Sequence, residues 1–133
     1  MRDHQVHDYS AILLDHYEQP RNLGDLPEAD AVALVHNPVC GDILRLAVQV
    51  TAGRIVEARF KAYGCAAAIA AGSMLTEMLT GASLEEAGAI READLIEALG
   101  GLPPMRVHAA VLGREGIREL LVRLRDRSGA GKA

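Results

Sequence analysis

The sequence has no tryptophan, and aromatic residues of any kind are scarce, with one phenylalanine and three tyrosines among 133 residues. A core must therefore be built from aliphatic side chains, and a surface that stacks nucleic-acid bases on aromatic rings is disfavoured. The formal charge of −4 also argues against a general phosphate-binding protein. We therefore expect no nucleic-acid partner.

Long apolar runs are missing as well. No segment approaches the roughly 20 apolar residues that a membrane-spanning helix needs, and the polar N-terminal stretch 1–10 contains no segment of signal-peptide type. We expect no membrane partner and a cytoplasmic location, where thiols stay reduced. The two cysteines, Cys40 and Cys65, are then candidates for metal binding or chemistry, with inert buried thiols as the alternative.

The chain length fits one domain, which we expect to span residues 1–133 with a core of about 8–125 and a mobile tail at 128–133. Alternation of apolar and polar residues predicts strands at 32–36, 43–50 and 54–62. A short glycine-containing join between the last two predicts an antiparallel hairpin. The residues expected to face the core are Leu44, Leu46, Val48 and Val50 in the second strand, and Val56, Ala58 and Phe60 in the third.

Helical periodicity and helix-end signals occupy most of the remaining chain. We expect a first helix at 8–17, with Ile12, Leu13 and Tyr17 at helical spacing, and a second from Ala66 to a stop at Gly81. A third, short helix should follow a capping box at Ser83–Glu86, and a fourth should lie at 92–99. We place Pro103 and Pro104 in the first turn of a last helix, which carries Ile117, Leu120, Leu121 and Leu124 on one stripe. The predicted fold class is α+β: a three-stranded antiparallel sheet with helices packed on one face.

Three segments carry residues that could do chemistry. Cys40 and Asp42 lie two positions apart in a turn before the second strand, so that in extended chain both would face one cation. Cys65 stands at the start of a helix, where backbone N–H groups and the helix dipole favour a thiolate. His108 lies in or near the first turn of the last helix. Their separations fit no local zinc-finger pattern, and each residue alone also fits a plain structural role.

Four motifs nevertheless occur together in one order. Asp15–Gly24 reads DHYEQPRNLG, Asn37–Asp42 reads NPVCGD, Phe60–Ala66 reads FKAYGCA and Leu102–His108 reads LPPMRVH. In this order and spacing, the chain resembles the IscU/NifU/SufU family of iron–sulfur cluster assembly scaffolds. The resemblance covers about residues 8–125.

The resemblance implies a SufE/NifU-like fold and a scaffold or carrier rather than an enzyme. Such a protein would bind a labile [2Fe–2S] cluster or iron and pass it to acceptor proteins. The implied partners are a cysteine desulfurase, apo iron–sulfur acceptor proteins, and a chaperone that reads Leu102–Arg106. Carried over by position, the ligands of the cluster or metal would be Cys40, Asp42, Cys65 and His108, with Zn²⁺ as an alternative occupant of the same site.

The sequence departs from the IscU branch directly after the histidine, where that branch has a third cysteine and this chain has Ala109. The chain could be a natural variant with another sulfur acceptor, a degenerate paralogue, or an engineered form. The alternative function is a zinc-binding sulfur acceptor, or sulfurtransferase, that assists a cysteine desulfurase. A third alternative is a domain that keeps only structural zinc.

Overall fold

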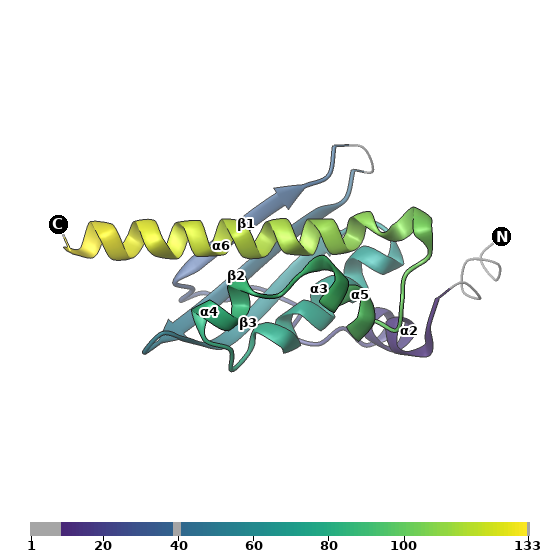
Figure 1. Cartoon of the computed structure of the whole chain (residues 1–133), viewed down its shortest axis with the longest axis horizontal. Helices are drawn as coiled ribbons and strands as arrows, with labels where there is room; N and C mark the ends of the chain where they lie inside the picture. Colours follow the sequence, from purple (N-terminus) through teal and green to yellow (C-terminus); the bar gives the residue numbers. More distant parts are fainter. Residues whose placement is uncertain (1–8, 39–40, 133) are drawn as a thin grey trace.

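The computed structural model of the chain describes residues 9–38 and 41–132, and side chains only up to residue 126. Three strands form one sheet, and the helices lie together on one side of it (Figure 1). The predicted α+β class is confirmed. In chain order the elements are α2 (Ala11–Glu18), β1 (Ala31–His36), β2 (Ile43–Thr51), β3 (Arg54–Tyr63), α3 (Ala66–Leu79), α4 (Leu84–Gly88), α5 (Glu92–Ala98), a 3-10 turn η1 (Pro104–Arg106) and α6 (His108–Lys132).

The sheet is antiparallel throughout, with the strand order β1-β2-β3. All three strands were predicted within one residue of their observed bounds. The hairpin between β2 and β3 turns on Ala52 and Gly53, whose φ angles of 53° and 77° are both positive. Such a two-residue turn matches the twist of the flanking strands. Leu44, Leu46 and Val48 face the core as expected and are buried.

A β-bulge overturns part of the predicted facing of β3. Gln49 pairs with Glu57 but the next residue, Val50, pairs with Ile55, so Val56 has no direct partner. The extra residue reverses the alternation of side chains toward the hairpin. Ile55 is therefore 2% exposed and Val56 is 50% exposed, and the prediction that Val56 faces the core is wrong.

Two helices cover the core face of the sheet, α3 over β3 and α6 over β1 and β2 (Figure 1). Small residues set how closely they approach. A Cβ atom on Gly72 of α3 would lie 2.4 Å from the ring of buried Phe60, and one on Gly116 of α6 would touch Leu44 and Leu46 at 3.4 Å. Gly72 and Gly116 therefore allow α3 and α6 to lie against the sheet. The helix α6 continues through its own glycines without a break.

Most helix ends follow the predicted signals. Ser83 and Glu86 form the capping box of α4, and Gly81 follows the C-cap of α3 with φ +90°. The prediction that Pro103 and Pro104 lie in the first turn of the last helix is wrong, because they lead into the separate turn η1. The helix α6 runs to Lys132, and the mobility of 128–133 stays a prediction. Among the described helices, none is both long enough and apolar enough to cross a membrane.

The first helix also differs from its prediction. It begins at Ala11, with Ser10 as the N-cap whose hydroxyl accepts the N–H of Leu13. Leu13 is buried as expected, but Ile12 and Tyr17 are exposed. The buried position is taken by His16, since α2 packs on α3 and α3 offers polar partners there.

The ring of His16 bridges two side chains of α3. Its Nδ1 lies 2.7 Å from the hydroxyl of buried Ser73, and its Nε2 lies 3.5 Å from a carboxylate oxygen of Glu77. Burial lowers the pKa of His16 below its usual 6.5, and the positive charge of Arg21 acts in the same direction. The carboxylates of Glu77 and Asp15 oppose this lowering but do not cancel it.

We predict that His16 makes the stability of the fold depend on pH. The unfolded chain binds a proton at this ring more readily than the folded chain, so the free energy of unfolding should fall as the pH drops through about 6.5 toward the lower folded pKa. Urea unfolding of the parent and of His16→Gln between about pH 7.5 and pH 5.5 measures this. The variant should show the shallower pH dependence. Equal slopes would contradict the assignment, and His36→Gln, at an exposed histidine, is the control.

Candidate metal centre

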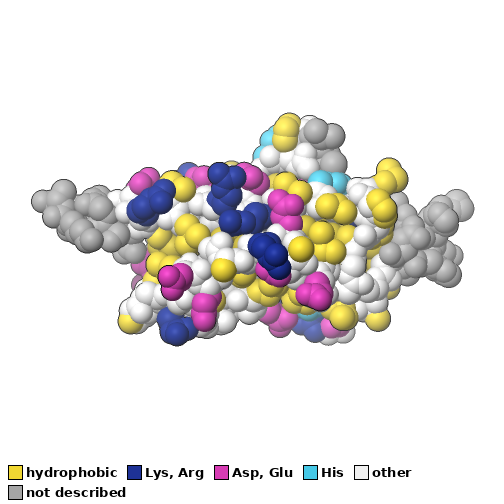
Figure 2. Space-filling model, in the orientation of Figure 1, with side chains coloured by type: hydrophobic (Ala, Val, Ile, Leu, Met, Phe, Trp, Pro, Cys, Tyr) yellow, Lys and Arg dark blue, Asp and Glu magenta, His cyan; other side chains and the backbone are white. Residues whose placement is uncertain are grey.

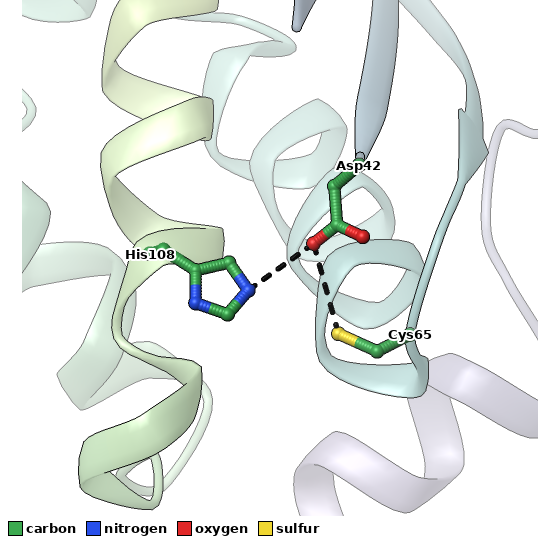
Figure 3. A group of neighbouring side chains, drawn as sticks. All are labelled: Asp42, Cys65 and His108. Carbon is green, nitrogen blue, oxygen red and sulfur yellow. Dashed lines mark hydrogen bonds and ion pairs between the residues drawn. The ribbon is translucent and has the colours of Figure 1, made fainter. Parts of the chain in front are cut away.

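Three chain segments that are distant in sequence end at the same place beside the sheet. Asp42 directly precedes β2, Cys65 directly precedes α3, and His108 is the first residue of α6. Their side chains point toward one another from these three elements (Figure 3). The sheet and the two helices therefore bring three different donor atoms, an oxygen, a sulfur and a nitrogen, close together.

The carboxylate of Asp42 lies at the centre of this group. One oxygen, Oδ2, is 3.2 Å from Nε2 of His108 and 3.9 Å from Sγ of Cys65 (Figure 3). One donor atom from each of the three residues lies within 4.8 Å of the other two. Asp42 is only 4% exposed, so its charge is largely removed from water. A buried carboxylate requires a compensating cation or hydrogen bonds, and here it has both a thiol and an imidazole within reach.

Two backbone hydrogen bonds tie Gly41 and Asp42 to Asn37, which directly follows β1. Asn37 donates its N–H to the carbonyl of Asp42 at 2.8 Å, and Gly41 donates to the carbonyl of Asn37 at 2.7 Å. These bonds lie directly beyond His36 and Ile43, the last pair of the β1–β2 ladder. The side chain of Asp42 is therefore held at the end of a rigid sheet.

Gly64 makes room for the carboxylate. A Cβ atom at this position would lie 2.2 Å from Oδ1 of Asp42, far inside van der Waals contact, and the φ of Gly64 is +153°. No residue with a side chain fits there unless Asp42 moves. Gly64 therefore brings the backbone before Cys65 directly against Asp42 and fixes the distance between the two donors.

Cys65 and His108 are placed by helix starts. Cys65 is the N-cap of α3, its carbonyl accepts the N–H of Ala68 at 3.0 Å, and its thiol is free and half-buried. The positive end of the α3 dipole therefore faces the thiol. Before His108, the turn η1 leads directly into α6 through Val107, which has helical angles. The prediction that His108 lies in the first turn of the last helix is confirmed.

A cation from a neighbouring segment faces the same group. Arg106 donates from Nε to the hydroxyl of Tyr9 at 3.2 Å. That hydrogen bond raises the pKa of Arg106 above its ordinary value, and the nearby Asp42 carboxylate acts in the same direction. In the sequence, Arg106 stands out only as part of the Leu102–Arg106 segment, and no residue pattern predicts its pairing with Tyr9, 97 positions away.

Cys40, predicted as the fourth ligand, lies outside the described residues. Ala109, the first residue after His108, is 2% exposed and belongs to the hydrophobic core. No other thiol among the described residues joins Cys65.

The chemistry of the donor set fits a transition-metal site. Thiolate and imidazole are preferred by Zn²⁺ and by iron in iron–sulfur centres, and a carboxylate can complete either. Three donors from one protein leave at least one position of a tetrahedral ion for a further ligand. The arrangement thus has the composition of a metal site that still accepts another thiolate.

The chain is similar in sequence to known proteins of one family. The NifU-like N terminal domain family matches residues 8–130. The iron–sulfur cluster assembly scaffold protein IscU of Haemophilus influenzae is 42% identical over 125 residues, which cover 91% of this chain and 98% of that protein. The scaffold protein IscU of Escherichia coli K12 is 43% identical over 114 residues, covering 83% of this chain and 88% of that protein.

Solved structures share the fold at lower identity. A NifU-like protein (N-terminal) from Brucella abortus superposes with a TM-score of 0.73 at 19% identity, covering 92% of this chain and 98% of that chain. A scaffold protein for the SUF system from Fervidobacterium islandicum gives a TM-score of 0.69 at 22% identity, covering 86% of this chain and 97% of that chain. These likenesses confirm the NifU-like fold that the motifs implied.

We predict that Gly64→Ala weakens metal binding without unfolding the protein, because the added methyl group must displace the Asp42 carboxylate. Loss of a supporting contact of this kind costs about 10–100-fold in metal affinity. Competition with a chromophoric zinc chelator measures the affinity. Gly24→Ala is the matched control, since Gly24 also has a positive φ, +134°, but no atom within 4 Å of its added Cβ. Equal zinc affinity in Gly64→Ala and the parent would contradict the arrangement.

Proposed function

Since this chain belongs to the NifU-like N terminal domain family, we propose that it is an iron–sulfur cluster assembly scaffold that holds a labile [2Fe–2S] cluster or iron and passes it to acceptor proteins. The observation that carries the proposal is the convergence of Asp42, Cys65 and His108 within 4.8 Å. The cluster is cargo in this function, so the protein is a binding protein and not an enzyme.

We assign four ligands to the cargo: Cys40, Asp42, Cys65 and His108. Cys40 precedes Asp42 by two residues, so chain connectivity keeps its Cα within about 7 Å of that of Asp42. Two thiolates and one carboxylate supply a charge of −3, and a [2Fe–2S]²⁺ core or a Zn²⁺ ion would leave the site at −1. A site of this small net charge is tolerable at the partly buried position that these residues occupy.

The ligand set favours release. A hard carboxylate is a weaker partner for an iron–sulfur core than a thiolate is, and one of the four ligands is Asp42. The imidazole of His108 and the thiol of Cys65 are partly open to solvent, so incoming thiols of another protein can reach the cargo. Lability suits a carrier, because a carrier must hand over what it binds.

The proposed partners are a cysteine desulfurase as the source of sulfur and apo iron–sulfur proteins as acceptors. A chaperone that reads Leu102–Arg106 also fits, since Met105 in the turn η1 is 80% exposed and ready for contact. A cytoplasmic location goes with such partners, and reduced thiols are what the site needs.

The zinc-binding sulfur acceptor is the less favoured alternative, because the relatives with 42–44% identity are named as scaffolds. An assay of a cysteine desulfurase with and without this protein separates the two functions. Strong stimulation of the desulfurase by a protein that forms no transferable cluster would favour the alternative. Zn²⁺ would then be the resident ion of the same four ligands.

We predict that anaerobic reconstitution with iron and sulfide gives a visible charge-transfer spectrum, and that Cys65→Ser and His108→Ala lose most of it, because each removes one of few ligands. Iron and sulfide per chain are measured with the absorption spectrum. His36→Ala removes an exposed imidazole outside the site and is the control for His108→Ala. Full cluster content in both site variants would contradict the assigned ligands.

We predict further that Asp42→Ala slows release of the cluster to an acceptor. The weakly bound carboxylate is the ligand that an incoming thiolate displaces most easily, and the variant lacks this first exchange step. Transfer from the loaded protein to an apo-ferredoxin, followed by circular dichroism, measures the rate. Asp126→Ala, which removes an exposed carboxylate near the far end of α6, is the matched control. A transfer rate that is unchanged or faster in Asp42→Ala would count against this role.

A further inference from the structure

The face of the sheet that turns away from the helices is only half covered. The segment 25–30 crosses the part of this face toward the β2–β3 hairpin, where Gln49 donates its side-chain amide to the carbonyl of Glu28 at 3.2 Å. Ala47, which points to this face, is 1% exposed as a result. The other half lies toward the metal centre. There the segment contacts Arg45 and Lys61 through the carboxylate of Asp25, and large apolar side chains remain exposed.

The open half consists of two rows of side chains that the strand register sets side by side. One row joins His36, Ile43 and Tyr63, and the next joins Leu34, Arg45 and Lys61. We call these six residues the outer-face patch. Leu34 is 64% and Tyr63 65% exposed, while Ile43 lies half-buried between the strands that carry them. Neighbours in adjacent rows of one sheet face are within reach of large side chains, so the three form one apolar centre.

The border of this apolar centre is positively charged. Arg45 and Lys61 share a single carboxylate, that of Asp25, at 2.7 Å and 3.2 Å. Two cations and one anion leave a charge of +1 here, on a chain whose formal charge is −4. A second copy stacked on this face by a two-fold axis would set the cations of the two copies against each other. A partner with carboxylates around an apolar side chain is the complementary occupant.

The patch also lies near three of the four proposed ligands along the chain. His36 precedes Cys40 by four residues, Ile43 follows Asp42 directly, and Tyr63 precedes Cys65 by two residues. A sulfur donor has to reach only one thiol, but an acceptor has to replace each ligand in turn. A protein seated on the ends of β1, β2 and β3 is in position for such an exchange.

We propose that the outer-face patch is the docking surface for the cluster acceptor, a protein that presents an apolar side chain ringed by carboxylates. This inference rests on the proposed scaffold function. Tyrosine and arginine, which Tyr63 and Arg45 supply here, are among the residues that most often carry the binding free energy of an interface, and the charged border steers association.

The test measures transfer from the cluster-loaded protein to an acidic apo-[2Fe–2S] ferredoxin, for the parent, Leu34→Ser and Arg45→Glu. We expect the transfer rate at subsaturating acceptor to fall about ten-fold in each variant, and the parent rate to fall with added salt. Cluster content per chain should be unchanged, because neither residue is a proposed ligand. Val56→Ser is the control, since Val56 is 50% exposed at the hairpin end of the same sheet.

The outcomes separate this proposal from the function on which it rests. If the parent forms no cluster, the scaffold function itself fails. If all variants load and transfer at the parent rate, the patch does not dock the acceptor. The remaining alternative is that a second copy of this chain binds the patch, and sedimentation velocity tests it. A parent dimer that Leu34→Ser converts to monomer would overturn the proposal. Tyr63→Ala, tested for the same loss of transfer, guards against a defect specific to Leu34.

Discussion

The contact of the Asp42 carboxylate with its neighbours is the constraint on which the site depends. A carboxylate in a residue that is only 4% exposed is costly unless partners surround it. The β1–β2 ladder fixes its backbone, Gly64 leaves space for its side chain, and His108 and Cys65 face it from two helix starts. The close packing of α3 and α6 on the sheet is what brings those two helix starts to the same end.

Much of the fold could be predicted because its signals are local. Alternation in β2 and β3, the positive-φ turn at Ala52-Gly53 and the capping box at Ser83 each depend on a few neighbouring residues. The errors arose where tertiary contacts decide. A bulge changes the facing of Val56 without a change in composition, and α2 buries His16 because Ser73 and Glu77 of α3 lie opposite it.

The site could be predicted only in part from the residues themselves. Spacing cannot bring Asp42, Cys65 and His108 together, since the folding of three separate segments decides their distances; the resemblance to the scaffold family supplied that grouping, and the structure brings these three side chains within 4.8 Å. Cys40 lies outside the described residues, so its part in the site is a proposal. The space at Gly64 and the Tyr9–Arg106 pair depend on contacts that no sequence pattern encodes.

The most direct test of the central claim is X-ray absorption spectroscopy of the zinc-loaded protein at one Zn²⁺ per chain. Convergence of two cysteines, one aspartate and one histidine predicts about two sulfur scatterers near 2.3 Å and about two nitrogen or oxygen scatterers near 2.0–2.1 Å. A first shell of oxygen and nitrogen alone, without sulfur, would contradict the proposed centre.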